Sequence, residues 1–84
     1  MKKNILEEDL TDEQFAALAY KTRRDILKII YDAPMSPRSI AEQLDGNIIY
    51  VKRHLHILLE CDLVFQSTRG NVRQYQSNRE LLSL

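Results

Sequence analysis

The stretch SPRSIAEQLDGNIIYVKRHLHILLE, residues 36–60, contains start and stop signals for two consecutive helices. Ser36 offers an N-cap oxygen, and Pro37 at the first helical position lacks an N–H that would be unpaired there anyway. Gly46 can adopt the left-handed conformation that ends this helix, and Asn47 can cap a second helix that runs to about residue 60. Two helices joined by so short a turn form a helix-turn-helix.

Downstream of this stretch the pattern changes from helical to extended. Residues 63–68 and 72–77 are rich in β-branched and aromatic side chains with partial alternation, and Gly70 and Asn71 lie between them. A glycine and an asparagine between two such runs are typical of a hairpin turn. The sequence therefore predicts a β-hairpin directly after the helix-turn-helix.

Two further helices are predicted before residue 36. Thr11 and Gln14 fit a capping box, which starts a helix over residues 12–19. The apolar stripe of this helix consists of Phe15, Leu18 and Ala19. Thr22 can cap the next helix, which ends before Pro34. The apolar side chains of that helix recur at helical spacing: Ile26, Leu27, Ile30 and Tyr31.

These elements predict a mainly α chain with a small β-hairpin, an α+β winged helix-turn-helix in which a three- to four-helix core carries a two-stranded wing. The 84 residues, 44% of them apolar, suffice for one hydrophobic core and not for two. We interpret residues 1–84 as a single domain with an N-terminal arm at 1–10, the helix-turn-helix at 36–60, the wing at 63–77 and a C-terminal segment at 78–84.

The distribution of charge is more informative than the net charge. Twelve Lys and Arg balance twelve Asp and Glu, so the formal net charge is zero. Residues 47–59 and 63–78 nevertheless contain no Asp or Glu. A surface that faces phosphates requires such a distribution, which predicts double-stranded DNA as the partner of the second helix and the wing.

The sequence argues against several other classes of protein. Cys61 is the only cysteine, so we expect no internal disulfide, no cysteine-based metal site and a reducing, cytoplasmic location. There is no signal-peptide pattern and no apolar run near the ~18 residues that a membrane span needs. Phosphate loops, nucleophile elbows and metal-binding His/carboxylate sets are missing too, so we expect neither an enzyme nor a cofactor.

Three stretches resemble the ArsR-type winged helix-turn-helix transcription regulators. KTRRDIL at residues 21–27 resembles the family's "TRR-x-IL", and SPRSIAEQL at 36–44 resembles its first helix-turn-helix element. VKRHLHILLE at 51–60, followed by DLV at 62–64, resembles the recognition-helix pattern "V-S-R-H-L-x-x-L-x-x-x-G-L-V". The resemblance implies a sequence-specific DNA-binding regulator, a repressor that acts as a homodimer. Metal-sensing members often carry a Cys-x-Cys pair in the recognition helix, and this sequence lacks one.

In a helix-turn-helix the second helix reads base edges in the major groove, while basic wing residues contact the backbone or the minor groove. Because Val51 and Leu55 face the core, helical spacing places six other residues of the second helix away from the core. The candidate DNA contacts are Asn47, Ile49, Tyr50, Lys52, Arg53 and His56 in the second helix, Arg69, Asn71 and Arg73 in the wing, and Ser36 and Arg38 at the start of the first helix.

Apolar residues at the two ends of the chain have no obvious place in this core. They are Ile5, Leu6, Leu81, Leu82 and Leu84. We predict that they meet across a two-fold axis in a homodimer. The sequence identifies no small-molecule effector.

Alternatives stay open for single residues and for the function. Ile49 and Tyr50 could be ordinary exposed apolar residues or pack on the first helix, and Arg53 could bind guanine or a phosphate. For His54 a hydrogen-bonded structural role is favoured over a metal-ligand role. The alternative function is a winged-helix protein-interaction module with little or no DNA binding, which the zero net charge and the apolar residues 48–50 favour.

Overall fold

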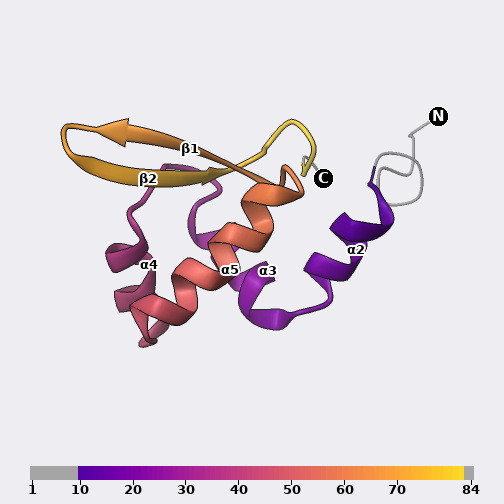
Figure 1. Ribbon diagram of the computed structural model, residues 1–84, viewed down its shortest axis with the longest axis horizontal. Coiled ribbons are helices and arrows are strands. Elements are labelled where there is room, and N and C mark those ends of the chain that lie inside the picture. Colours follow the sequence, from indigo (N-terminus) through magenta and orange to yellow (C-terminus); the bar gives the residue numbers. More distant parts are fainter. Residues whose placement is uncertain (1–9, 83–84) are drawn as a thin grey trace.

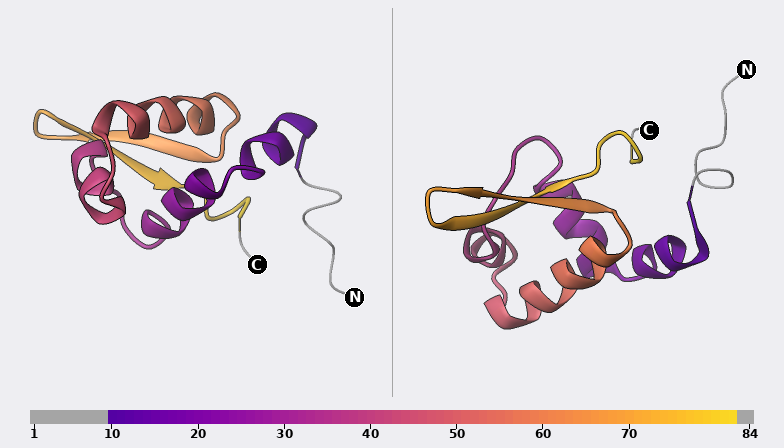
Figure 2. Two further views of the ribbon diagram at one scale, coloured as in Figure 1. Left: turned by 90° about the horizontal axis from the view of Figure 1, so that it is seen from below. Right: turned by 45° about the horizontal axis from the view of Figure 1, so that its top comes forward.

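The computed structural model describes residues 10–82 as four helices followed by a two-stranded antiparallel hairpin (Figure 1). The helices are α2 (Asp12–Leu18), α3 (Lys21–Ile29), α4 (Pro37–Leu44) and α5 (Ile48–Glu60), and the strands are β1 (Val64–Arg69) and β2 (Val72–Ser77). The hairpin turn and α4 lie at one end of the molecule, and α2 extends at the opposite end (Figures 1 and 2). This is the predicted mainly α architecture with a two-stranded wing.

The capping box at the start of α2 forms as predicted, and Leu18 packs against the core as predicted, but the inward placement of Phe15 and Ala19 was wrong. The Thr11 hydroxyl accepts from the Gln14 N–H at 3.2 Å, and the Gln14 side chain accepts from the Thr11 N–H at 2.8 Å. Gln14 and Ala17 are buried, whereas Phe15 and Ala19 are exposed. The cause is a tertiary contact: Gln14 Nε2 also donates to the carbonyl of Cys61 at 2.7 Å, which turns this side of α2 toward the end of α5.

Helix α3 begins earlier than predicted, and Thr22 does not cap it. The N-cap is Tyr20, which makes no side-chain cap hydrogen bond. Its carbonyl accepts from the N–H groups of Arg23 and Arg24 at 3.1 and 3.2 Å. Arg24 also donates from its side chain to the carbonyl of Leu18 at 2.6 Å. Because α2 and α3 are bound together across so short a connection, the first turn of α3 includes Lys21 and needs no hydroxyl cap.

The turn between α4 and α5 has the predicted caps with one correction. Ser36 caps α4 through its side chain, which accepts from the Ser39 N–H, and Pro37 occupies the first turn. The left-handed residue that ends α4 is Asp45, with φ 53°, and not Gly46. Aspartate tolerates this conformation better than most residues, and Gly46 then donates its N–H to the carbonyl of Ala41 at 2.9 Å.

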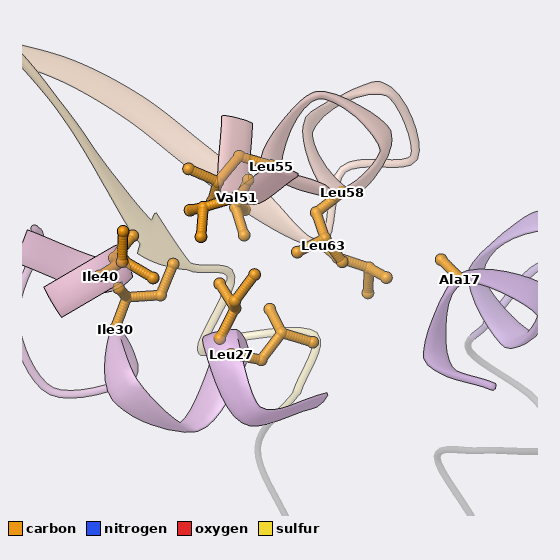
Figure 3. Close-up of a cluster of buried hydrophobic side chains, with 11 residues drawn as sticks. Ala17, Leu27, Ile30, Ile40, Val51, Leu55, Leu58 and Leu63 are labelled. Carbon is orange, nitrogen blue, oxygen red and sulfur yellow. The ribbon is translucent and has the colours of Figure 1, made fainter. Parts of the chain in front are cut away.

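The hydrophobic core lies between α3, α4, α5 and the start of β1 (Figure 3). Its fully buried side chains come from each of these elements: Ile26, Ile30, Ile40, Val51, Leu55, Leu58, Leu63 and Val64. Ala17 adds a contact from α2 at the edge of this cluster. The core therefore fixes α5 by one face and leaves its other sides for contacts outside the core.

The hairpin has the predicted two-residue turn. Arg69 pairs with Val72, and Gly70 between them has φ 64°, the placement of glycine typical of a type II′ turn. A third short pairing was not predicted. Met35 exchanges two backbone hydrogen bonds with Tyr75, at 3.0 and 2.8 Å, and so ties the segment before α4 to β2. This bridge holds the wing beside the N-terminus of α4.

The C-terminal segment corrects the premise of the predicted dimer contact. Leu81 and Leu82 are half-buried and pack against the core, so these two residues do have a core role. The Leu82 N–H donates to the carbonyl of Asn78 at 2.9 Å, and the Asn78 side chain donates to the carbonyl of Asp62 at 2.9 Å. Ile5, Leu6 and Leu84, the other residues of that prediction, lie outside the described residues.

Ser77 joins the end of β2 to the end of α3. Its hydroxyl donates to the carbonyl of Leu27 at 2.7 Å, and its N–H donates to the carbonyl of Ile30 at 3.1 Å. The last carbonyls of a helix have no partner within the helix, so Ser77 supplies donors that α3 needs. Only 2% of Ser77 is exposed, and water cannot replace its hydroxyl.

We therefore expect Ser77→Ala to lower the free energy of unfolding by about 1–2 kcal/mol, because a buried carbonyl loses its donor. Urea unfolding followed by circular dichroism measures this difference. Ser67→Ala is the matched control, since Ser67 is exposed on β1 and should change stability by less than about 0.5 kcal/mol. Equal effects of the two substitutions would contradict a structural role for the Ser77 hydroxyl.

Candidate nucleic-acid interface

A groove of ≈ 990 Å³ runs between the N-terminus of α4, one side of α5 and the hairpin. It contains six of the predicted DNA contacts: Ser36, Arg38, Lys52, His56, Asn71 and Arg73. The other residues that line it are Pro37, Ile48, Leu59, Gln66, Thr68, Val72 and Tyr75. Three separate elements therefore bring most of the predicted polar contacts into one concave surface.

The groove suits a polyanion. Arg38 comes from α4, Lys52 from α5 and Arg73 from β2, so three cations face it from three sides. None of the residues that line it is an Asp or a Glu. Amide and hydroxyl groups from the hairpin add neutral donors between the cations. Such a surface can hold the phosphate backbone of a nucleic acid through charge and hydrogen bonds together.

Sequence reasoning missed the neutral side chains that the hairpin contributes to this groove. Gln66 pairs with Tyr75, and Thr68 pairs with Arg73, across the two strands. Residues directly opposite each other in an antiparallel pair lie on the same face, so all four side chains turn toward α5 together. The alternation of residues along each strand shows which side chains share a face, but the strand register was needed to tell which face turns toward α5.

The helical repeat divides the remaining surface of α5 into separate sides. Lys52 and His56 lie on the side that lines the groove. Ile49 and Arg53 are exposed on the side opposite the core. Tyr50 lies on a third side, where its ring meets that of His54. The predicted contacts on α5 thus share one helix without forming one surface.

Five predicted contacts lie outside the groove lining: Asn47, Ile49, Tyr50, Arg53 and Arg69. Ile49 is 65% exposed and Tyr50 is 54% exposed, so neither is packed away in the core. Arg69 is exposed at the end of β1, beside the hairpin turn. The first turn of α5 therefore exposes an isoleucine and a tyrosine at the surface.

Asn47 has a structural task at this helix start. Its side-chain oxygen accepts from the N–H groups of Ile49 at 2.8 Å and Tyr50 at 3.3 Å. These N–H groups have no partner inside the helix, so Asn47 satisfies them as the predicted N-cap. Its oxygen is occupied by this cap, which leaves the side-chain N–H₂ for a base edge or a phosphate.

The two histidines of α5 have different environments. His56 is exposed, and its Nε2 lies 3.4 Å from Oε1 of Glu60, one turn along the helix. His54 is only 5% exposed, and its Nδ1 accepts from the Nε–H of Arg23 at 3.1 Å. Burial, with the nearby positive charges of Arg23 and Arg53, lowers the pKa of His54 below its ordinary value. The prediction of a hydrogen-bonded structural His54 is confirmed.

Residues 10–82 contain no group of three His, Cys, Asp or Glu side chains arranged to hold a metal ion. Burial raises the pKa of the Cys61 thiol, whose Sγ donates to the carbonyl of Ile57 at 3.3 Å. Within the same range, no helix is both long and apolar enough to cross a membrane.

The model of one domain family, described as a helix-turn-helix domain, matches residues 18–64, more than half of the chain. The chain belongs to this helix-turn-helix family. The helix-turn-helix domain also resembles an ArsR-like transcriptional regulator from Rhodococcus sp. RHA1, with 31% identity and a TM-score of 0.78 over 83% of this chain. It spans 66% of the length of that regulator. The ArsR-type resemblance is thereby confirmed.

Two more distant structures have the same fold. Reduced HlyU from Vibrio cholerae is 23% identical, with a TM-score of 0.74 over 82% of this chain and 74% of its own. A winged helix-turn-helix domain from Mycobacterium bovis is 20% identical, with a TM-score of 0.81 over 98% of this chain and 81% of its own. No curated protein sequence gives a significant match. The Rhodococcus protein is described as a transcriptional regulator, in agreement with the prediction that the helix-turn-helix domain is not an enzyme.

For this helix-turn-helix domain we expect Asn47→Ala to lower the free energy of unfolding by about 0.5–2 kcal/mol, because two N–H groups of α5 lose their acceptor. Urea unfolding measures the loss. Asn47→Ser is the matched control, since serine keeps an oxygen at the N-cap and should restore most of the stability. A serine variant as unstable as the alanine variant would contradict the capping role.

Proposed function

We propose that this helix-turn-helix domain binds double-stranded DNA sequence-specifically, with α5 in the major groove and the phosphate backbone in the groove between α5 and the wing. The observation that carries this proposal is the acid-free groove in which Arg38, Lys52 and Arg73 converge from three elements. Its geometry supports a division of tasks: the groove residues position the domain on the backbone, and the outward side of α5 reads the bases.

The outward side of α5 offers two kinds of base contact. Arg53 is exposed there and can donate two hydrogen bonds to a guanine or pair with a phosphate. Ile49 is 65% exposed and can meet a thymine methyl group. At the hairpin turn, Arg69 and Asn71 can follow the backbone or enter the adjacent minor groove.

A salt series tests DNA binding directly. If Arg38, Lys52, Arg53, Arg69 and Arg73 each neutralise one phosphate, about five counterions are released per domain, and log K falls with log salt at a slope of about −4.5. Fluorescence anisotropy with genomic DNA fragments measures this slope. Selection of bound fragments from a random pool then defines the site. Absence of salt-dependent binding near micromolar protein would contradict the proposal.

We further propose that the protein acts as a homodimeric repressor in the cytoplasm. The Mycobacterium bovis domain of the same fold is described as homodimeric. Leu81 and Leu82 are only half-buried, so part of each side chain is free to join Ile5, Leu6 and Leu84 across a two-fold axis. Two copies of α5 would then read a pseudo-palindromic site.

Light scattering at tens of micromolar protein tests the dimer, and a monomeric mass would contradict it. A reporter gene with the selected site in its promoter tests repression: transcription should fall when the protein is present, and a rise would instead assign activation.

The second candidate function is a protein-interaction module. Ile49 and Tyr50 together expose an apolar surface at the start of α5, where small polar residues are usual in the family that this chain resembles. Arg53→Ala combined with Arg69→Ala separates the two functions. A DNA-binding domain loses affinity and about 2 units of salt slope, whereas an interaction module shows no DNA affinity to lose.

A further inference from the structure

Four side chains form a cluster on the side of α5 that faces away from the groove. They are Tyr20 and Arg23 at the start of α3, and Tyr50 and His54 in α5. His54 is the buried member, while Tyr20 and Tyr50 are each more than half exposed. The cluster thus runs from the surface of α3, through a buried imidazole, to the first turn of the helix that we propose to enter DNA.

Arg23 is held in one position by two contacts. Its guanidinium lies over the ring of Tyr20, 4.2 Å from the centroid, and its Nη1 donates to the carbonyl of Ala17 at 3.4 Å. Its Nε–H then points at Nδ1 of His54, which accepts at 3.1 Å. An imidazole nitrogen can accept only when it carries no proton, so the neutral ring has its proton on Nε2.

His54 in turn holds Tyr50. The two rings meet edge to face, with centroids 4.5 Å apart and an interplanar angle of 86°. Such aromatic pairs favour a defined geometry, so the partly exposed Tyr50 ring has a fixed neighbour on one side. The Tyr50 N–H is also bound by the Asn47 cap, which fixes the backbone beneath the ring.

We infer that His54 is a positioning residue for DNA binding: in its neutral form it accepts from Arg23 and holds the Tyr50 ring at the DNA-facing first turn of α5, and protonation of His54 weakens DNA binding. The inference rests on the proposed function, because it assigns a pH response to that same DNA-binding surface.

The surroundings of His54 disfavour its cationic form. A protonated ring carries N–H on both nitrogens, so Nδ1–H would then face the Nε–H of Arg23 with no acceptor between them. The charges that act on the ring are Arg23 from α3 and Arg53 from its own helix, and both are positive. The α2 group next to Arg23 is the neutral carbonyl of Ala17. His54 Nε2 has no hydrogen-bond partner among the described residues.

The sign of the pH response follows from these contacts. Burial and the two arginines lower the pKa of His54 below its ordinary value, so the buried ring favours its neutral form and takes up a proton only on acidification. DNA affinity attributable to His54 should therefore fall on acidification.

His56 is the only other histidine of the sequence and lies in the groove lining, outside the cluster, so its removal leaves His54 as the single histidine. DNA binding is measured by anisotropy from about pH 8 to about pH 5 at constant ionic strength, with circular dichroism confirming the fold at each pH. In the His56→Gln variant, which isolates His54, we expect the Kd to rise about tenfold across this range. In the His54→Gln variant the Kd should not rise, because the glutamine oxygen still accepts from Arg23 but takes up no proton. A His56→Gln variant without this rise, or a His54→Gln variant with it, would overturn the inference.

Two further measurements locate the effect. NMR titration of His54 in His56→Gln protein should give a lower pKa in the DNA complex than in the free protein, because DNA selects the neutral ring. Phosphate charge alone would raise that pKa, and such a rise would overturn the inference.

Adding Tyr50→Ala to His56→Gln should remove the pH response, and a response that persists would overturn the role of Tyr50. Absence of DNA binding by the wild-type protein at about pH 8 contradicts the proposed function itself, whereas binding by the His56→Gln variant without a pH response overturns only the inference.

Discussion

Replacing Lys52 and Arg73 together by alanine is expected to weaken DNA binding by about 100-fold and to flatten the salt slope by about 2. The two residues face the same groove, Lys52 from α5 and Arg73 from β2. A charged hydrogen bond contributes about 1.5 kcal/mol or more, so the loss of two amounts to about 3 kcal/mol. Both side chains are exposed, so the fold should be unaffected.

The matched control for this experiment is Lys28→Ala combined with Arg79→Ala. These two residues are also exposed and do not line the groove, so the control removes the same charge from another part of the surface. Anisotropy with the selected DNA site, repeated at several salt concentrations, gives both the affinity and the slope for each double variant. Equal losses for the two variants would show that net charge, and not the groove, determines binding.

Leu55→Ala is expected to produce the largest loss of stability among the substitutions considered. Leu55 is 1% exposed at the centre of the core, and a buried leucine reduced to alanine costs about 2–5 kcal/mol. Domains have a total stability of about 5–15 kcal/mol, so this loss is a large part of the free energy of unfolding. Urea unfolding followed by circular dichroism measures the change, and DNA affinity should fall with the folded fraction.

Ile49→Ala on the same helix is the control for packing. Ile49 is 65% exposed, so its truncation should change stability by less than about 0.5 kcal/mol. The two substitutions remove similar amounts of apolar side chain from positions six residues apart, one buried and one exposed. A Leu55→Ala variant as stable as Ile49→Ala would contradict the position of Leu55 in the core.

Local features of this protein were predictable because they depend on neighbours in the chain. Thr11, Ser36 and Asn47 cap their helices, and each does so through an N–H two or three residues away. Gly70 takes a positive φ in a two-residue turn, which is a property of glycine itself. The spacing of Val51, Leu55 and Leu58 correctly predicted which side of α5 is buried, because the residues of a buried helix face recur at the helical repeat.

Errors in the prediction arose where a distant residue changed the outcome. Phe15 was placed inward because it is apolar, but Gln14 is buried instead, since it reaches a carbonyl 47 residues further along the chain. Thr22 was placed as a cap because it is a good capping residue, but the contacts between α2 and α3 start that helix earlier. The local sequence predicts where a helix starts and which side it buries only where no tertiary contact competes.

The candidate site also combines features that neighbouring residues determine with features that distant residues determine. The sequence alone determined a winged helix-turn-helix in which residues 47–59 and 63–78 carry basic side chains and no Asp or Glu, because capping, periodicity and composition are properties of short stretches. Only the tertiary structure decided that Arg38, Lys52 and Arg73 share one groove, that Arg53 lies outside it and that Arg23 binds His54 across 31 residues. These outcomes depend on the packing of α3, α4 and α5 and on the strand register, and interactions between residues far apart in the chain set both.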